Sequence, residues 1–187
     1  DLVINNAGVA AGGSALNAST AEWQWMLNIN LLGVARGCRL FGPVLIEQGK
    51  GHIVNIASFA ALAGAPGMAC YAAAKAGVVA VSEGLRADLH GSGVGVSVVC
   101  PSFFQTNLLE SFRGPDTTTR NIAASLMRDA KESAADIAEQ IFQAVAHGEF
   151  LILPSAEVRQ RWRIKRWFPN LYFRKLMRAV QARRADP

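Results

Sequence analysis

The sequence predicts an α/β protein in which helices cover both faces of one parallel sheet, in a doubly wound arrangement. Short apolar runs rich in β-branched residues alternate along the chain with longer stretches of helical periodicity, which is the pattern of βαβ units. These runs are too continuously apolar for strands with one solvent-exposed face, and they suit a sheet buried on both sides. With 187 residues and 51% hydrophobic content, the chain can form a domain with a sizeable core.

Four strands and three long helices are expected. The strands are the short apolar runs Leu2–Asn5, Ile53–Ala57, Val94–Cys100 and Phe150–Leu153. The helices are expected over residues 19–48, 68–90 and 133–147. The first helix opens with a capping box, in which Ser19 is followed three residues later by Glu22, and Ser133 and Asp136 open the last helix in the same way.

The stretch 103–131 interrupts this alternation after the third predicted strand. It is polar and contains Gly114-Pro115, which are turn-forming residues. A doubly wound sheet binds its ligand in a crevice at the carboxyl ends of its strands. We therefore expect this stretch to be a mobile lid or substrate loop.

Cysteine usage and apolar run lengths favour a soluble cytoplasmic protein. Cys38, Cys70 and Cys100 are an odd number at spacings that fit neither a disulfide framework nor a zinc site, so buried thiols are expected and no metal site is predicted. No apolar run approaches the roughly 20 residues that span a bilayer, and residues 1–4 lack the basic flank of a signal peptide.

The positive charge is concentrated at the carboxyl end of the chain. Residues 1–158 hold 9 Lys and Arg against 13 Asp and Glu, whereas residues 159–187 hold 10 against 1. We therefore divide the chain into a body, residues 1–155, and a basic amphipathic helical extension, residues 156–187. The extension could pack on a partner subunit or on the body's acidic surface, or it could contact a membrane peripherally. Nucleic acid is the least favoured partner because no known nucleic-acid module accompanies it.

The residues with the clearest chemical meaning are Tyr71 and Lys75, which follow Ser58 by thirteen and seventeen positions. A phenol and an ammonium four residues apart share one helical face. Near a strand-end hydroxyl, this pair could move a proton to or from a substrate oxygen, with the ammonium lowering the phenol's pKa from about 10. Each residue alone would more often be structural, as a half-buried aromatic, a solvated charge and a turn former. Their joint spacing favours catalysis.

Five motifs occur together in order over about residues 1–108. They are Asn5-Asn6-Ala7-Gly8, Asn30-Leu31-Leu32-Gly33, Ser58, Tyr71-Ala72-Ala73-Ala74-Lys75 and Pro101-Ser102-Phe103-Phe104-Gln105-Thr106. In this combination the chain resembles the short-chain dehydrogenase/reductase family. The resemblance implies a Rossmann fold that binds NAD or NADP, seen here as its carboxyl-terminal part. It also implies interconversion of a secondary alcohol and a ketone by hydride transfer.

The resemblance assigns catalytic roles to four residues. Tyr71 would be the general acid and base, and Ser58 would hydrogen-bond the reacting oxygen. Lys75 would hold the nicotinamide ribose and lower the pKa of the phenol. Asn30 would anchor a water that links Lys75 to solvent, although an Asn within a helix can instead bind backbone at a kink. Asn28 is a weaker candidate because it should face elsewhere on the helix.

The resemblance also implies where the cofactor lies. Asn6, Ala7 and Gly8 would touch its adenosine part, while Asn5 braces the sheet; a plain turn is the alternative for this segment. Pro101, Phe104 and Thr106 would meet its nicotinamide end, together with Tyr71 and Lys75. A helix N-cap is the alternative for Thr106. The family's usual glycine after the proline is replaced by Ser102, whose Cβ can shift the backbone there.

The same resemblance bears on substrate and assembly. Apolar residues near the site indicate a hydrophobic alcohol or ketone, and the family implies a homodimer or homotetramer built partly on the two long central helices. No glycine-rich phosphate loop follows any strand, so we expect the units that carry it to precede residue 1 and expect residues 1–187 to bind dinucleotide poorly. The alternative is a non-catalytic scaffold whose basic tail binds a membrane or partner.

Overall fold

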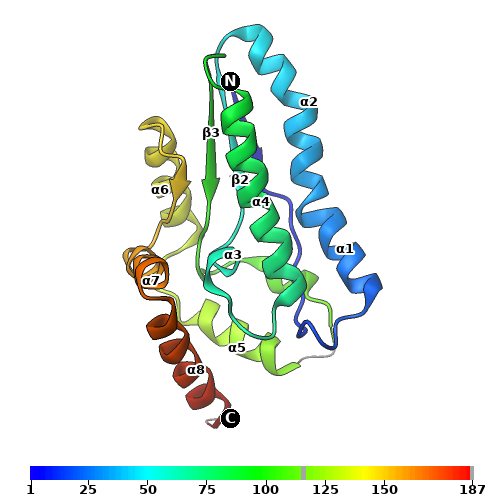
Figure 1. Cartoon of the computed structure of the whole chain (residues 1–187), viewed down its shortest axis with the longest axis vertical. Helices are drawn as coiled ribbons and strands as arrows, with labels where there is room; N and C mark the ends of the chain where they lie inside the picture. Colours follow the sequence, from blue (N-terminus) through cyan, green and yellow to red (C-terminus); the bar gives the residue numbers. More distant parts are fainter. Residues whose placement is uncertain (115–116, 186–187) are drawn as a thin grey trace.

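The structure, a computed structural model, describes residues 1–114 and 117–185 and contains one parallel sheet. Its strands are β1 (Leu2–Asn5), β2 (Gly51–Ile56), β3 (Val94–Val99) and β4 (Leu151–Ile152), in the order β1-β2-β3-β4 (Figure 1). The doubly wound α/β prediction is confirmed. β2 begins two residues earlier than expected because Gly51 already pairs with Val94, and β3 and β4 end sooner than their apolar runs do.

Helices cover both faces of this sheet. α1 (Thr20–Asn30), α2 (Leu32–Gln48) and α4 (Ala69–Asp88) lie side by side on one face, and α6 (Ala134–Ala146) lies on the other (Figure 1). Successive strand residues point to opposite faces. Ile53 accordingly packs in the core cluster that contains Val34 and Val78, whereas its neighbour Val54 packs with Ala144.

The helix expected over residues 19–48 is two helices that meet at Leu31. The predicted capping box at Ser19 is present, with its hydroxyl accepting a hydrogen bond from the Glu22 amide. Contrary to the sequence-based expectation, the stretch Thr20–Gln48 is long and apolar enough to cross a bilayer by length and composition alone. Core helices of soluble proteins satisfy the same criterion, and Met26 and Val34 on its inner side are buried in the core.

The stretch expected to be a lid contains regular structure. It includes a 3₁₀ helix, η1 (Asn107–Ser111), and α5 (Thr117–Arg128), while Pro115 and Asp116 lie outside the described residues. The backbone of Arg113 pairs with the loop after β1, because its N–H donates to Ala10 and its carbonyl accepts from Gly12, both at 3.1 Å. In the structure this stretch is therefore fastened to the body.

The chain ends in two helices, α7 (Ala156–Trp167) and α8 (Pro169–Ala185), with Phe168 between them. α8 begins at Pro169, directly after the break. Val158 on α7 is buried in the same core cluster as the short helix α3 (Ala60–Ala63). The proposed division at residue 155 stays a prediction, and the first turns of the extension pack on the body. Residues 186 and 187 lie outside the described part of the chain.

Candidate active site

Ser58 is held at the carboxyl end of β2 by backbone pairing with the end of β3. The Ala57 N–H donates to the Val99 carbonyl and the Phe59 N–H donates to the Pro101 carbonyl, both at 2.8 Å. Ser58 is thus fixed between two hydrogen-bonded residues. Its hydroxyl accepts from the Ala60 N–H at 3.1 Å, at the start of α3. The backbone pairing at the strand ends therefore fixes the position of Ser58 at the edge of the sheet.

Tyr71 and Lys75 occupy the inward face of α4, as their spacing predicts. Tyr71 is 5% exposed and Lys75 is 4% exposed. A side-chain hydrogen bond joins Tyr71 to Ser58, and Lys75 Nζ donates to the Ile56 carbonyl at 2.8 Å. The phenol, the ammonium and the serine hydroxyl therefore meet at the carboxyl end of β2.

Burial controls the protonation of this cluster. Burial raises the pKa of Tyr71 above its ordinary 10, while the hydrogen bond from Ser58 opposes that rise and Cys100 adds slightly to it. The net shift is therefore opposite to the lowering expected from Lys75, because burial outweighs the contributions that lower the pKa. Burial lowers the pKa of Lys75 from 10.5 to about 8. At pH 7 the ammonium is mostly charged and the phenol is neutral.

Cys100 is a member of the site that the sequence analysis assigned only to the core. Burial raises the pKa of its thiol from 9.0 to about 12, against the opposing effects of the Ser58 backbone and the Lys75 charge. The pairing of β2 with β3 could have indicated that Cys100 lies at the site. Ile56 is level with Val99, so the residue after each strand, Ala57 and Cys100, lies at the same depth.

Asn30 is fully buried at the end of α1 and holds the loop that follows β1. Its amide oxygen accepts from the Val9 N–H and its amide nitrogen donates to the Val9 carbonyl, each at 2.9 Å. The nitrogen also lies 2.8 Å from Met26 Sδ. The side chain is thus engaged with backbone at the break between α1 and α2, and its role in a water relay stays a prediction. Asn28 is exposed and binds Arg36.

In the segment at the end of β1, Asn5 has the bracing role that the sequence indicates, and the residues after it lie at the edge of the site. Asn5 donates to Asn55 Oδ1 at 2.8 Å and braces β1 against β2. Asn6 and Ala7 are exposed beyond the strand end. Gly8 lies beside the catalytic cluster, where a Cβ would be 3.2 Å from Asn30 Oδ1 and 3.5 Å from Lys75 Nζ. The absence of a side chain at Gly8 keeps this edge of the site open.

The segment after β3 presents the residues expected at the nicotinamide end. Pro101 is buried, Phe104 is partly buried and Thr106 is exposed. Thr106 precedes η1 with an extended backbone, and its side chain makes no capping hydrogen bond. Thr106 therefore stands at the N-cap position of η1, but its hydroxyl does not cap the helix. Its contact with the cofactor stays a prediction.

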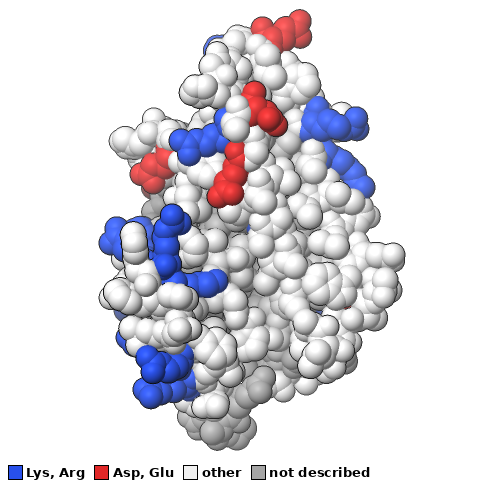
Figure 2. All heavy atoms as spheres, viewed as in Figure 1, with Lys and Arg blue, Asp and Glu red and all other residues white. Residues whose placement is uncertain are grey.

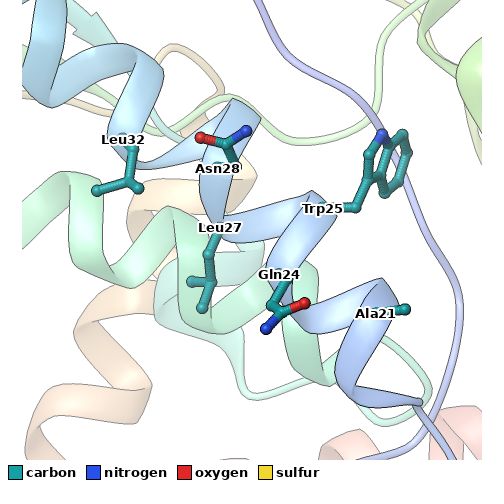
Figure 3. Close-up of a pocket in the computed structure, with 6 residues that line it drawn as sticks. All are labelled: Ala21, Gln24, Trp25, Leu27, Asn28 and Leu32. Atoms are coloured by element: carbon teal, nitrogen blue, oxygen red, sulfur yellow. The ribbon is translucent and has the colours of Figure 1, made fainter.

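A groove on the outer side of α1 is separate from this cluster. It is lined by Ala21, Gln24, Trp25, Leu27, Asn28 and Leu32. Figure 3 shows Trp25 and Leu32 at its two ends, and Arg113 stacks on Trp25 at 4.3 Å from the ring centroid. Within residues 1–114 and 117–185, no group of His, Cys, Asp or Glu side chains could hold a metal ion.

The short chain dehydrogenase family model matches residues 1–116, more than half of the chain. The chain belongs to this family. A ketoacyl reductase, HetN from Nostoc, is 36% identical over 144 residues, which are 73% of this chain and 50% of HetN. The probable oxidoreductase EphD of Mycobacterium tuberculosis is 39% identical over 125 residues, 65% of this chain and 21% of EphD. The chain thus spans half or less of these relatives.

A solved structure extends the likeness over most of the chain. A short chain dehydrogenase/reductase from Burkholderia phymatum, in complex with NAD, superposes with a TM-score of 0.84 at 33% identity. The match covers 91% of this chain and 66% of the Burkholderia chain. The Rossmann-type fold and the assignment to an oxidoreductase family therefore rest on sequence and on structure together.

Proposed function

We propose that the protein is an NAD(P)-dependent oxidoreductase that interconverts a secondary alcohol and a ketone. The observation that carries the proposal is the meeting of Tyr71, Ser58 and Lys75 at the carboxyl end of β2. In a doubly wound sheet this edge is the ligand-binding edge. The three side chains supply a proton donor, a hydrogen-bond donor and a fixed positive charge within one buried cluster.

The residues around Gly8 fit a dinucleotide. Gly8 offers backbone without a side chain, and exposed Asn6 and Ala7 continue the same edge. Lys75 has three donor hydrogens and uses one on Ile56, so the others can bind ribose hydroxyls. Pro101, Phe104 and Thr106 would meet the nicotinamide end. When bound, NAD or NADP supplies or accepts the hydride.

The protein's own residues handle the proton. In reduction, the neutral Tyr71 hydroxyl gives its proton to the substrate oxygen, and in oxidation the phenolate takes that proton back. Ser58 donates a hydrogen bond to the same oxygen as negative charge develops there. The high pKa of Tyr71 suits the donor role at neutral pH. The nearby ammonium of Lys75 would stabilise the phenolate once the proton has left.

A hydrophobic substrate is the second element of the proposal. Phe103, Phe104 and Met68 are partly exposed; the first two follow Pro101, which pairs with Phe59, and Met68 packs in the cluster that contains Tyr71. Phe59 and Leu62, which follow Ser58 closely in the sequence, are buried in the core with Val158. The apolar contribution to substrate binding is therefore assigned to the segment after β3 and to Met68 at the start of α4.

The test is spectrophotometric turnover at 340 nm with both cofactors, in the complete protein that contains this chain. Medium-chain ketones and secondary alcohols are the first substrates to screen. Tyr71→Phe should lower kcat at least about a hundredfold while cofactor binding is retained. Tyr172→Phe is the matched control, because Tyr172 is the other tyrosine and lies on α8. Equal turnover by Tyr71→Phe and the parent would contradict the proposal.

Assembly and location complete the proposal. α2 exposes Leu40, Phe41 and Val44, and α4 exposes the small residues Ala73, Ala80 and Gly84. These faces would join two copies into a dimer, or four into a tetramer. A cytoplasmic location is supported by Cys38, Cys70 and Cys100, which are buried and unpaired.

A further inference from the structure

α7 is fixed to the body along one side only. Val158 is 2% exposed, and Trp162 packs against the same core cluster. Lys165 Nζ donates to the Leu62 carbonyl at the end of α3, and Arg159 donates to the Leu153 and Pro154 carbonyls, each at 2.7 Å. The body therefore holds α7 in a defined orientation, and the opposite side of this helix faces outward.

The outward side leads into an apolar corner where α7 meets α8. Trp167 is 72% exposed, Phe168 is 62% exposed and Phe173 is 61% exposed. Leu171, on the first turn of α8, is also exposed. These four large apolar side chains lie within seven consecutive positions and form a patch, unlike apolar residues that are exposed singly. We call Trp167, Phe168, Leu171 and Phe173 the aromatic corner.

Basic side chains flank the aromatic corner on both helices. Exposed residues of this kind are Arg163, Arg166, Arg174, Lys175 and Arg178. Arg163 lies one helical turn before Trp167, on the same face of α7. The sequence contains no Asp or Glu between residues 158 and 185. Figure 2 shows Lys and Arg side chains gathered over α7 and α8 at the left of the view, with acidic side chains in the upper half.

We propose that the aromatic corner is a peripheral docking site for an anionic phospholipid bilayer. Trp and Phe favour the boundary between headgroups and acyl chains, and Arg and Lys beside them complement negative headgroups. A nucleic-acid contact would use the charges but has no need of Phe168 and Leu171 in one exposed cluster. An exposed apolar patch whose charged neighbours in the sequence from Arg159 to Ala185 are all Lys or Arg matches a charged membrane surface.

The attachment of α7 sets the orientation of the body on that surface. α7 contacts α3, which begins two residues after Ser58. In Figure 1 the segments α3, α5, α7 and α8 lie at the end of the molecule toward which β3 points. A bilayer bound at the aromatic corner therefore lies at the same end of the protein as the candidate active site.

The experiment is cosedimentation of the full protein with vesicles of phosphatidylcholine alone and of phosphatidylcholine with phosphatidylglycerol. We expect binding to the anionic vesicles and a loss of about tenfold or more in partition coefficient for Trp167→Ser with Phe168→Ser. Charge reversal at Arg163, Arg166 and Arg174 to Glu should cause a comparable loss. The matched control, Phe142→Ser with Lys50→Glu, changes an exposed apolar residue on α6 and an exposed basic residue just before β2 and should bind like the parent.

A second readout reports insertion at one residue. Brominated acyl chains quench tryptophans that enter the bilayer, and Trp167 is the exposed member of four, the others being Trp23, Trp25 and Trp162. Quenching should disappear in Trp167→Phe although this variant still sediments with the vesicles. The proposal is overturned if the parent fails to bind anionic vesicles at low salt, or if the Trp167→Ser, Phe168→Ser variant binds as well as the parent. It is also overturned if the Trp167→Ser, Phe168→Ser variant becomes monomeric but still binds the vesicles as the parent does.

Discussion

Tyr71 and Lys75 lie on the inward face of α4, where burial shifts their pKa values in opposite directions. Both shifts favour the neutral form, because moving a charge out of water is costly. Lys75 keeps a hydrogen bond to the Ile56 carbonyl, which a neutral amine can also make. The protein therefore bears a cost for holding this side chain inside while it is charged.

That cost predicts a pH dependence of stability. The pKa of Lys75 is about 8 in the folded state against an ordinary 10.5, so the unfolded chain binds more protons at this residue between these values and the contribution of Lys75 to stability rises with pH across that window. The raised pKa of Cys100 contributes a fall above about pH 9, so the contribution of Lys75 is read from a comparison with a variant that lacks it. The full contribution is about 3 kcal/mol. Denaturant unfolding of the parent and of Lys75→Met at pH 7.5 to 10 measures this contribution, because stability should change more positively with pH in the parent than in the variant. A parent and variant with the same slope would contradict this account.

Gly8 gives a second prediction at the residue scale. A Cβ there would be 3.2 Å from Asn30 Oδ1 and 3.5 Å from Lys75 Nζ. Because hydrogen bonds fix both of these side chains, Gly8→Ala should cost about 1 kcal/mol or more of folding free energy. Gly33→Ala is the control, because a Cβ at Gly33 meets nothing within 4 Å. It should leave stability unchanged or raise it by up to about 1 kcal/mol. Equal losses in the two variants would refute the crowding argument.

The polar members of the candidate site were predictable from order and spacing, and their surroundings were not. Tyr71 and Lys75 share a face because helical geometry is regular, and Ser58 follows a strand whose end meets that face. The part of Asn30 in holding Val9 depends on how the loop after β1 folds back. The rise in the pKa of Tyr71 depends on its burial by residues distant in sequence, which local sequence does not encode.

At the scale of elements, the loop after β1 joins the candidate lid to the start of α4. Gly13 accepts from the Ala69 N–H at 3.1 Å and donates to the Gly67 carbonyl at 2.8 Å. The neighbouring residues Ala10 and Gly12 pair with Arg113 on the lid side. One loop therefore connects the lid with the helix that carries Tyr71.

Close packing at Gly12 makes this connection testable. A Cβ at Gly12 would be 2.6 Å from Phe112 Cζ and 3.3 Å from Thr119, so Gly12→Ala should displace the lid and cost about 1 to 2 kcal/mol. Hydrogen exchange of the Arg113 amide should accelerate, since that amide donates to Ala10. Unchanged exchange of this amide in the variant would show that the lid does not depend on the contact.

The stretch 103–131 also shows where the prediction of helices from the sequence was wrong. Turn-forming residues at Gly114-Pro115 and a polar composition favoured a loop, yet Ile122, Ala123, Leu126 and Met127 have helical spacing and lie on the inner side of α5. That periodicity was an available signal. At Leu31 the signal was weaker: Asn30 was recognised as a residue that can bind backbone at a kink, but the contacts that hold it there are distant in sequence.

At the scale of the whole molecule, the proposed assembly uses the exposed apolar face of α2. Phe41 is half exposed on that face, and Phe41→Glu should convert the proposed dimer or tetramer into monomers, as measured by light scattering after size exclusion. Phe142→Glu on α6 is the control, with an equally apolar and exposed parent residue, and should keep the parent mass. A monomeric parent protein would remove the assembly proposal.

The central claim, that Ser58 and Tyr71 act in one pocket, can be measured directly because the chain contains only two tyrosines. In a Tyr172→Phe background, ultraviolet titration of tyrosinate reports Tyr71 alone. We predict a pKa above 10 that rises further in Ser58→Ala, because the serine hydrogen bond lowers the pKa against the effect of burial. The same midpoint with and without Ser58, or a midpoint below 10, would contradict the account.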